Sequence, residues 1–254
     1  MPAHSAHAKV NGLEMYYEVH GTDRPGTRPL VLLHGGGNTV GLSFAAVLPT
    51  LAADRLVVAP ELQGHGRTAD IDRPLTVPLL ASDVIALLDE LGIEQADLFG
   101  FSLGGLTALE VAVRHPERVG RLVTAAAPYT QDGFHEDVRV PDYSSPRLPT
   151  PADFQEMADA YAAVAPDPGH FQEFLAKVSE AAHAPLPWTA DDLRGLRAPT
   201  LVLVGDNDFV TVEHAAEMHR LIPDSRLAVL PGTTHLTLMR RTSLVLPLLG
   251  EFLA

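Results

Sequence analysis

Short apolar runs rich in valine and leucine recur along this chain, and they constrain its fold more than any other feature. Each run is about four residues long and lacks alternation with polar residues, which is typical of strands buried on both faces of a parallel sheet. The runs cover residues 30–33, 56–59, 97–99, 122–125, 201–204 and 227–230.

Segments with helical spacing lie between these runs. Within residues 82–91 the apolar side chains recur with the spacing i, i+3, i+4 and i+7, and residues 103–113 are apolar almost all round, as in a helix packed on a sheet. Residues 14–20 alternate more strictly and predict an antiparallel edge strand. We therefore predict an α/β fold with a mostly parallel, doubly wound sheet of about eight strands.

The alternation breaks between Tyr129 and about Gly195, where the chain is rich in proline and contains no convincing strand. Two amphipathic helices are predicted there, with apolar faces that comprise Phe154, Met157, Ala158 and Tyr161 in one and Phe171, Phe174, Leu175 and Val178 in the other. An insertion of this length with its own helices favours a lid over a disordered loop. The predicted domains are a core of residues 1–128 and 196–254 and a helical lid of residues 129–195 after the sixth strand.

Composition excludes several classes of function. Lys and Arg total 18 against 32 Asp and Glu, so the formal net charge is −14, which would repel a nucleic-acid backbone. The chain has no cysteine, and this rules out disulfides, thiolate metal sites and a cysteine nucleophile. Residues 1–10 do not read as a secretory signal, and no apolar run approaches the ~18 residues of a membrane span. We expect a soluble, cytoplasmic protein.

The sharpest motif is G-F-S-L-G at residues 100–104, between a predicted strand and a predicted helix. A sharp strand-to-helix turn strains the backbone of its middle residue, and only small neighbours avoid a clash there. Gly100 and Gly104 are such neighbours, so we expect the Ser102 hydroxyl to stand exposed above the sheet as a nucleophile. The backbone N–H of Leu103 would then stabilise negative charge on a substrate oxygen.

A serine hydroxyl needs a base to take its proton, and in sheets of this kind the chain order is serine, acid, histidine. The run 201–204 leads into G-D-N-D, which offers Asp206 and Asp208 as the acid. The last run leads into P-G-T-T-H and so to His235. Both loops follow strand ends, where open α/β sheets place their sites. The residues alone leave the choice of aspartate open.

On these motifs the chain resembles the α/β-hydrolase superfamily, in its lidded group of serine esterases and lactonases. The resemblance runs from about Val10 to Phe252 and is weakest across the lid. It is carried by L-L-H-G-G-G at 32–37, G-H-G-R-T at 64–68, the Ser102 turn, G-D-N-D at 205–208 and G-T-T-H at 232–235.

The resemblance implies roles for several of these residues. Asp208, the third residue after its glycine, would be the acid, and Asp206 would shape the turn. The second oxyanion donor would come from the glycine run, with Gly36 preferred and Gly37 as the neighbouring candidate. His34 would brace the loop.

The chain also departs from some relatives. Glu61 stands where relatives commonly have Asp, at a position that is normally structural. Ser102 argues against epoxide and haloalkane hydrolysis, which use an aspartate nucleophile. Relatives that cleave C–C bonds often have an aromatic residue directly after the histidine. Leu236 stands at that position here and argues against C–C bond cleavage.

The resulting hypothesis is a serine hydrolase that cleaves a small or medium carboxylic ester with Ser102, His235 and Asp208, without a metal or organic cofactor. The alternatives are lactone hydrolysis, perhydrolysis with the same triad, and a ligand receptor with little turnover. The expected partner is a small ester or lactone, with no nucleic acid and no membrane, and the oligomeric state is not predicted. The substrate-binding candidates are Phe101, Tyr129, Phe154, Met157, Tyr161, Phe171, Phe174, Trp188 and Leu236. Packing of the insertion onto the core is the competing interpretation of the lid aromatics and of Trp188.

Overall fold

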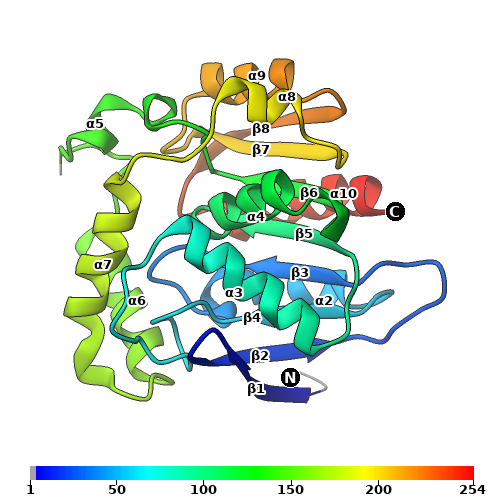
Figure 1. Ribbon diagram of the computed structural model, residues 1–254. Helices are drawn as coiled ribbons and strands as arrows, with labels where there is room; N and C mark the ends of the chain where they lie inside the picture. The colour runs from blue at the N-terminus through cyan, green and yellow to red at the C-terminus, as the bar shows by residue number, and fades with distance from the viewer. Residues whose placement is uncertain (1–3, 143) are drawn as a thin grey trace.

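A computed structural model describes residues 4–142 and 144–254, and in these ranges eight strands form one sheet (Figure 1). The strand order is β1-β2-β4-β3-β5-β6-β7-β8. Only the β1–β2 and β2–β4 pairs are antiparallel among the described strands. The strands are β1 (His4–Val10), β2 (Leu13–His20), β3 (Leu30–Leu33), β4 (Val57–Pro60), β5 (Ala96–Phe101), β6 (Val119–Ala125), β7 (Thr200–Asn207) and β8 (Ser225–Thr234). The predicted mostly parallel sheet is confirmed.

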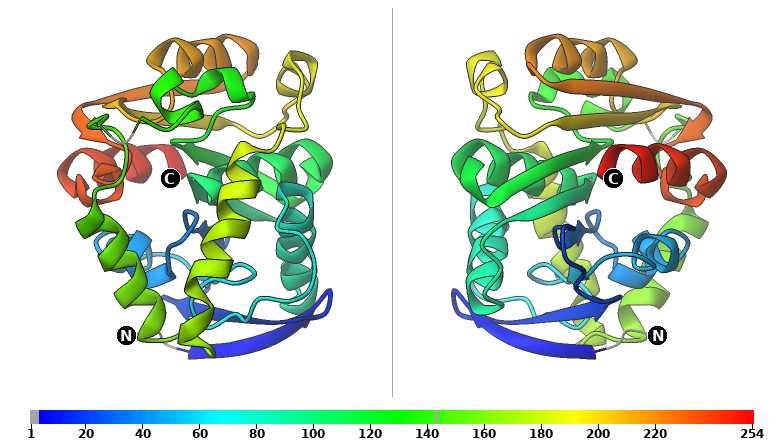
Figure 2. Two further views of the ribbon diagram at one scale, coloured as in Figure 1. Left: turned by 90° about the vertical axis from the view of Figure 1, so that its left-hand side faces the viewer. Right: turned by 90° about the vertical axis from the view of Figure 1, so that its right-hand side faces the viewer.

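Helices cover both faces of the sheet, as Figure 2 shows. One face carries α3 (Val77–Glu90), α4 (Leu103–Arg114), α8 (Ala190–Arg194) and α9 (Val212–Leu221), and the other carries α1 (Val40–Phe44), α2 (Leu48–Leu51) and α10 (Thr242–Leu253). Successive residues of a strand point to opposite faces. In β5, Leu98 therefore joins one hydrophobic core and Phe99 joins the other, and both are fully buried. This explains why the strands read as unbroken apolar runs.

Strand β1 has no counterpart among the runs found in the sequence. It pairs with β2 along its whole length, with His7 opposite Tyr16, and it buries only Ala8 and Val10. Its remaining side chains are polar or small and largely exposed, so nothing in its composition distinguishes it from a loop. Pairing with β2 is what makes it a strand. The expectation of an edge strand at residues 14–20 is therefore wrong, because β1 occupies the edge and β2 pairs on both sides.

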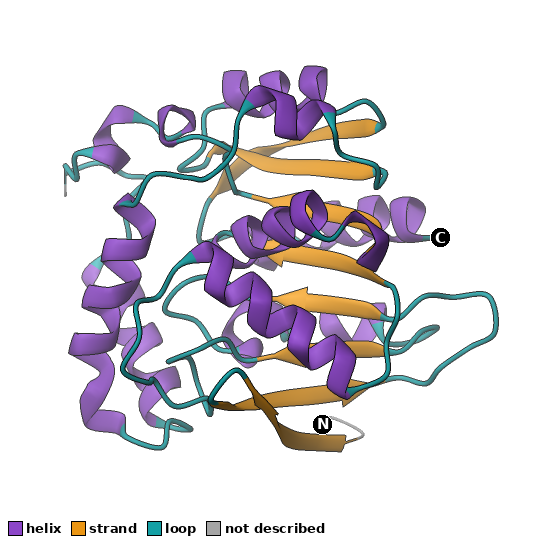
Figure 3. Cartoon of the chain, in the orientation of Figure 1, coloured by secondary structure: helices purple, strands orange, loops and turns teal. Residues whose placement is uncertain are grey.

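Several helices lie between β6 and β7, within the insertion of residues 129–195. It contains α5 (Glu136–Arg139), α6 (Pro151–Ala162) and α7 (Phe171–His183), with short 3₁₀ turns at Gln131–Gly133 and Pro168–His170. Helix α6 begins with a capping box, in which Thr150 and Asp153 satisfy each other's backbone N–H groups. Helices α6 and α7 lie across the carboxyl ends of the parallel strands (Figure 3). The insertion thus covers the edge of the sheet where the predicted site lies.

In the described ranges no helix has both the length and the apolar character that a membrane span requires. In the same ranges His, Asp and Glu side chains form no group of three placed to hold a metal ion.

Candidate active site

Ser102 occupies the turn between β5 and α4 with a strained backbone, at φ 54° and ψ −118°. A non-glycine residue in this region costs about 1–3 kcal/mol and persists only where its surroundings impose it. The surroundings do so by close packing. A Cβ on Gly100 would lie 2.1 Å from the Gly104 carbonyl oxygen, and one on Gly104 would lie 2.0 Å from that of Leu33. Both glycines of the motif are therefore required for the turn.

Ser102, His235 and Asp208 form a hydrogen-bonded chain. His235 Nε2 lies 3.0 Å from Ser102 Oγ, and His235 Nδ1 lies 2.7 Å from Asp208 Oδ1. Asp208 is fully buried and also accepts the N–H groups of Gly205 (3.2 Å) and Phe209 (2.6 Å). Because β7 and β8 are parallel neighbours, the loops at their carboxyl ends bring acid and histidine together.

Asp206 has a different position. It is exposed, and it accepts the N–H groups of Thr233 and Gly232, each at 2.9 Å. These two bonds hold the pKa of Asp206 below its usual value and fix the turn that leads to His235. The geometry separates the two aspartates: Asp208 contacts His235, and Asp206 holds the backbone of the loop before it.

One neighbour of the histidine was not foreseen. The ring of Phe209 stacks on that of His235 with centroids 3.8 Å apart and planes 7° apart. The Phe101 ring also contacts His235, at 5.0 Å. The only sequence signal for Phe209 is its place directly after Asp208. The two aromatic rings restrict the orientation of the imidazole that meets Ser102.

Near Ser102, the backbone N–H groups of Gly36 and Leu103 have no hydrogen-bond partner within the part of the chain that the structure describes. The two residues are neighbours, since a Cβ on Gly36 would lie 3.7 Å from Leu103 Cβ. The adjacent amides are engaged: Gly35 N–H reaches Ser43 Oγ at 3.4 Å, and Gly37 N–H donates to His65 Nε2 at 3.1 Å. The N–H of Gly37, the neighbouring candidate for an oxyanion donor, is therefore already hydrogen-bonded within the protein.

His34 is fully buried beneath this glycine run. Its Nε2 accepts the N–H of Leu62 at 3.0 Å, so Nδ1 carries the proton and donates to the Gly35 carbonyl at 2.9 Å. Burial lowers the pKa of His34 to about 4. The side chain is a neutral brace and lies outside the Ser102–His235–Asp208 chain.

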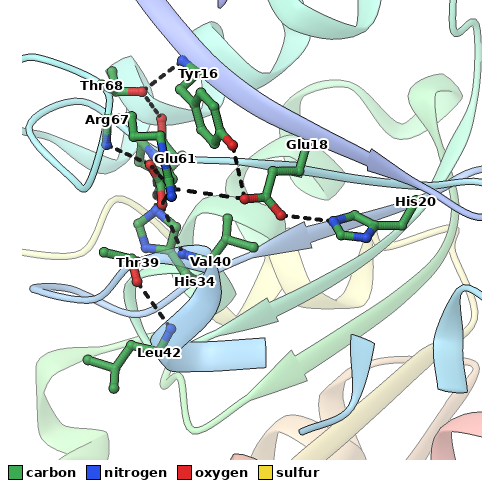
Figure 4. Close-up of polar contacts among 11 residues, drawn as sticks. Tyr16, Glu18, His20, His34, Thr39, Val40, Leu42, Glu61, Arg67 and Thr68 are labelled. Carbon is green, nitrogen blue, oxygen red and sulfur yellow. Dashed lines mark hydrogen bonds and ion pairs between the residues drawn. The ribbon is translucent and has the colours of Figure 1, made fainter. Parts of the chain in front are cut away.

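Glu61 joins the loop that contains Arg67 to the start of α1 at Val40 (Figure 4). Its buried carboxylate accepts the N–H groups of Arg67 at 2.6 Å and Val40 at 3.3 Å, and it pairs with the Arg67 guanidinium at 3.3 Å. Arg67 also lies 3.9 Å from Glu18. Burial raises the pKa of Glu61, while the bonds from Arg67 lower it. The expected structural role of this position thus holds with the longer acid.

A small cavity, about 40 Å³, lies beside the site between α6 and the core. Three of the substrate-binding candidates line it: Phe101, Met157 and Leu236. Its other lining residues include Leu42, Met239 and, at the polar end, Asn38, Asp153, Glu156 and Arg240. Arg240 and Glu156 form an ion pair at 2.7 Å that joins the core to α6.

The other candidates lie elsewhere. Tyr161, Phe171 and Phe174 pack on one another with ring centroids 5.1 to 6.5 Å apart, and they form the buried contact of the insertion with the core. Phe154 is 39% exposed on the surface of α6. The burial of Tyr161, Phe171 and Phe174 favours the packing interpretation for these three, because the apolar faces of α6 and α7 hold the insertion in place. Phe154 neither lines the cavity nor is buried.

Tyr129 and Trp188 are likewise placed away from the cavity. Tyr129 stacks on His214 and donates its hydroxyl to Glu217 at 3.0 Å, both on α9. The buried Trp188 donates its indole N–H to Glu110 at 2.5 Å, about two turns along α4 from Ser102. Trp188 therefore anchors the end of the insertion to the core.

Comparison with known proteins agrees with the fold and the motifs. Residues 30–245 match the sequence profile of the family described as "Alpha/beta hydrolase family". The chain belongs to this family. It is 30% identical over 250 residues to the 2-hydroxy-6-oxo-2,4-heptadienoate hydrolase of Pseudomonas putida, and the match covers 89% of each chain. It is 43% identical over 98 residues to the 2-hydroxymuconate semialdehyde hydrolase of Pseudomonas sp. strain CF600, which covers 37% of this chain and 35% of that relative.

Among solved structures, the enol-lactonase from Burkholderia xenovorans LB400 is similar in fold. Its TM-score is 0.79 at 24% identity, and the match covers 97% of this chain and 99% of the lactonase. Family and fold together make this protein a hydrolase.

Proposed function

We propose that this hydrolase cleaves a small or medium carboxylic ester through an acyl-enzyme on Ser102. The observation that carries the proposal is the continuous chain from Ser102 Oγ through His235 to the buried Asp208. His235 Nε2 takes the serine proton as Oγ attacks the ester carbonyl, and it returns that proton to the leaving alcohol. Water then attacks the acyl group with His235 again as the base.

Asp208 orients the imidazole and stabilises its charged form. Because Oδ1 lies 2.7 Å from Nδ1, the proton of neutral His235 stays on Nδ1 and the lone pair on Nε2 faces the serine. The carboxylate is kept in place by three donors, the N–H groups of Gly205 and Phe209 and the Nδ1–H of His235.

The N–H groups of Gly36 and Leu103 are proposed as the oxyanion hole. Acyl transfer builds negative charge on the carbonyl oxygen, and preorganised donors stabilise it. The neighbouring position of these residues and their lack of another partner support this assignment. Loss of one such donor costs about 10²–10³-fold in rate in well-studied hydrolases.

We further propose that residues 129–195 act as a lid on the core of residues 1–128 and 196–254. The insertion presses directly on the glycine run: a Cβ on Gly36 would meet Val178 at 2.9 Å, and one on Gly37 would meet Met157 at 3.3 Å. The remaining cavity holds only a few water molecules. Substrate entry therefore needs α6 or α7 to shift.

A second candidate is hydrolysis of a C–C bond, supported by the similarity over 250 residues to the heptadienoate hydrolase. The substrate of such an enzyme, a dienoate, is an anion. The charges near the cavity argue against it, because Asp153 and Glu156 outnumber Arg240 there. Lactones share the chemistry of esters, and the fold of the enol-lactonase supports including them. Perhydrolysis and a slow receptor use the same three residues.

The test is steady-state hydrolysis of p-nitrophenyl esters from acetate to decanoate, with wild type beside Ser102→Ala. Turnover that depends on chain length and disappears in Ser102→Ala supports the proposal, and activity that survives in the variant refutes it. A lactone, a 2-hydroxy-6-oxo-dienoate and a peracid assay are run in parallel. Turnover confined to one of these selects that alternative, and a single equivalent of product on every substrate indicates a receptor.

A further inference from the structure

Two buried histidines bind successive peptide groups of the glycine run. His34 Nδ1–H holds the Gly35 carbonyl at 2.9 Å, and His65 Nε2 holds the Gly37 N–H at 3.1 Å. Because a peptide unit is planar and trans, the Gly35 carbonyl and the Gly36 N–H point in opposite directions within one rigid group. The Gly36 N–H thus lies between two groups that are held by hydrogen bonds, the Gly35 carbonyl and the Gly37 N–H.

The protonation state of His65 follows from its partners. Gly37 N–H is a donor, so Nε2 must present its lone pair, and Nδ1 carries the proton that it donates to the Gln63 carbonyl at 2.9 Å. Burial, together with the nearby His34, lowers the pKa of His65 well below its usual value. His65 is a neutral acceptor.

The ring of His65 cannot easily turn away from this position. It lies 4.6 Å from the His34 ring and 4.6 Å from the Phe174 ring of α7, which meets it edge to face at 81°. A Cβ on Gly64 would also strike the Phe174 ring, at 2.7 Å. His65 is therefore held by its own loop, by the glycine run and by the insertion.

We propose that His65 is a positioning residue of the oxyanion hole, which aims the Gly36 N–H by holding the next N–H of the same loop. This inference rests on the proposed function. Three successive glycines have wide conformational freedom, and without an acceptor for Gly37 N–H the peptide group after Gly36 can rotate and shift the Gly36 backbone. His34 alone holds only the peptide group before Gly36, through the Gly35 carbonyl. The role of the G-H-G motif at 64–66 is then to fix the direction of the Gly36 N–H. Its histidine acts on the glycine run although His65 lies 28 residues after Gly37 in the sequence.

A matched pair of variants tests the proposal. In His65→Gln the side-chain oxygen reaches about as far as Nε2 and keeps an acceptor for Gly37. In His65→Asn the shorter amide reaches about as far as Nδ1, so it keeps a donor for the Gln63 carbonyl and leaves Gly37 without an acceptor. Both variants place an amide in the same buried site, and they differ in which of the two hydrogen bonds survives.

We expect kcat of His65→Asn to fall by about 10- to 100-fold, since a small misplacement of a catalytic group has effects of that size. KM should change little, because the oxyanion contact strengthens only in the transition state. The Ki of a boronic acid, which forms a tetrahedral adduct on serine, should rise with the fall in kcat. His65→Gln should keep a kcat well above that of His65→Asn, and circular dichroism and thermal unfolding establish that both variants are folded.

Equal kcat in the two folded variants, or a change in KM alone, overturns the proposal. If Ser102→Ala is inactive while His65→Asn is fully active, this inference fails and the proposed function stands. If Ser102→Ala stays active, the proposed function itself fails. Should neither variant fold, amide hydrogen exchange of the wild type decides: protection of Gly37 above Gly36 supports the clamp, and the reverse order overturns it.

Discussion

Replacing Asp208 by asparagine removes one charge and one acceptor from the centre of the site while keeping its shape. In the structure Asp208 Oδ1 accepts from His235 and Phe209, and Oδ2 accepts from Gly205. An amide has only one oxygen, so its NH₂ group must face one of these donors. If the NH₂ faces His235, the ring proton moves to Nε2 and the base can no longer accept from Ser102.

If the NH₂ group instead faces Gly205, two donors meet at 3.2 Å in a fully buried position, at a cost of about 1–3 kcal/mol. In either orientation the imidazolium loses its counter-charge. The same change lowers kcat about 10⁴-fold in a well-studied triad, which corresponds to roughly 5 kcal/mol of transition-state stabilisation. We expect a fall of about 10³–10⁴-fold here.

Asp206→Asn is the matched control, because it makes the same chemical change two residues away. Its amide oxygen can keep one of the two backbone bonds to the loop before His235. We expect less than about a tenfold loss of kcat, since only the loop is loosened. Both variants are assayed on the ester that wild type turns over fastest. A larger loss in Asp206→Asn than in Asp208→Asn would refute the assignment of the acid.

Two further predictions concern stability. Trp188→Phe removes the indole donor from the buried Glu110, so we expect a loss of about 1.5–3 kcal/mol and a Tm lowered by about 3–12 °C with unchanged KM; a raised KM with unchanged Tm in calorimetry would instead place Trp188 in the substrate pocket. His34 has a folded pKa of about 4 against 6.5 when unfolded, so the unfolded chain binds its proton first as the pH falls. The contribution of His34 to the free energy of unfolding is therefore fully present above pH 6.5, and about 3 kcal/mol of it is lost toward pH 4. Urea unfolding between pH 7 and pH 4.5 measures this, and a slope unchanged in His34→Gln, which lacks this buried imidazole, would contradict the reasoning.

The parallel strands were predictable because burial on both faces leaves a local signature in the sequence. The same holds for Ser102, whose turn needs small residues on either side within five positions of the chain. Helices α6 and α7 were predictable for a similar reason, since an amphipathic face follows from spacing alone. What an amphipathic face cannot show is its partner. Phe174 packs under the insertion against His65, whereas Met157, on the neighbouring helix, lines the cavity.

Local sequence determined the buried parallel strands and the residue types at their ends: the glycine-flanked serine, the acidic loop and the histidine after the last strand. These features depend on interactions within a few residues. The tertiary structure decided between Asp206 and Asp208, because the pairing of β7 with β8 sets which carboxylate meets His235. It also decided which glycine N–H remains free, because His65 takes that of Gly37 from a distant loop. Both choices depend on hydrogen bonds between segments far apart in the chain, and only the folded arrangement of those segments determines them.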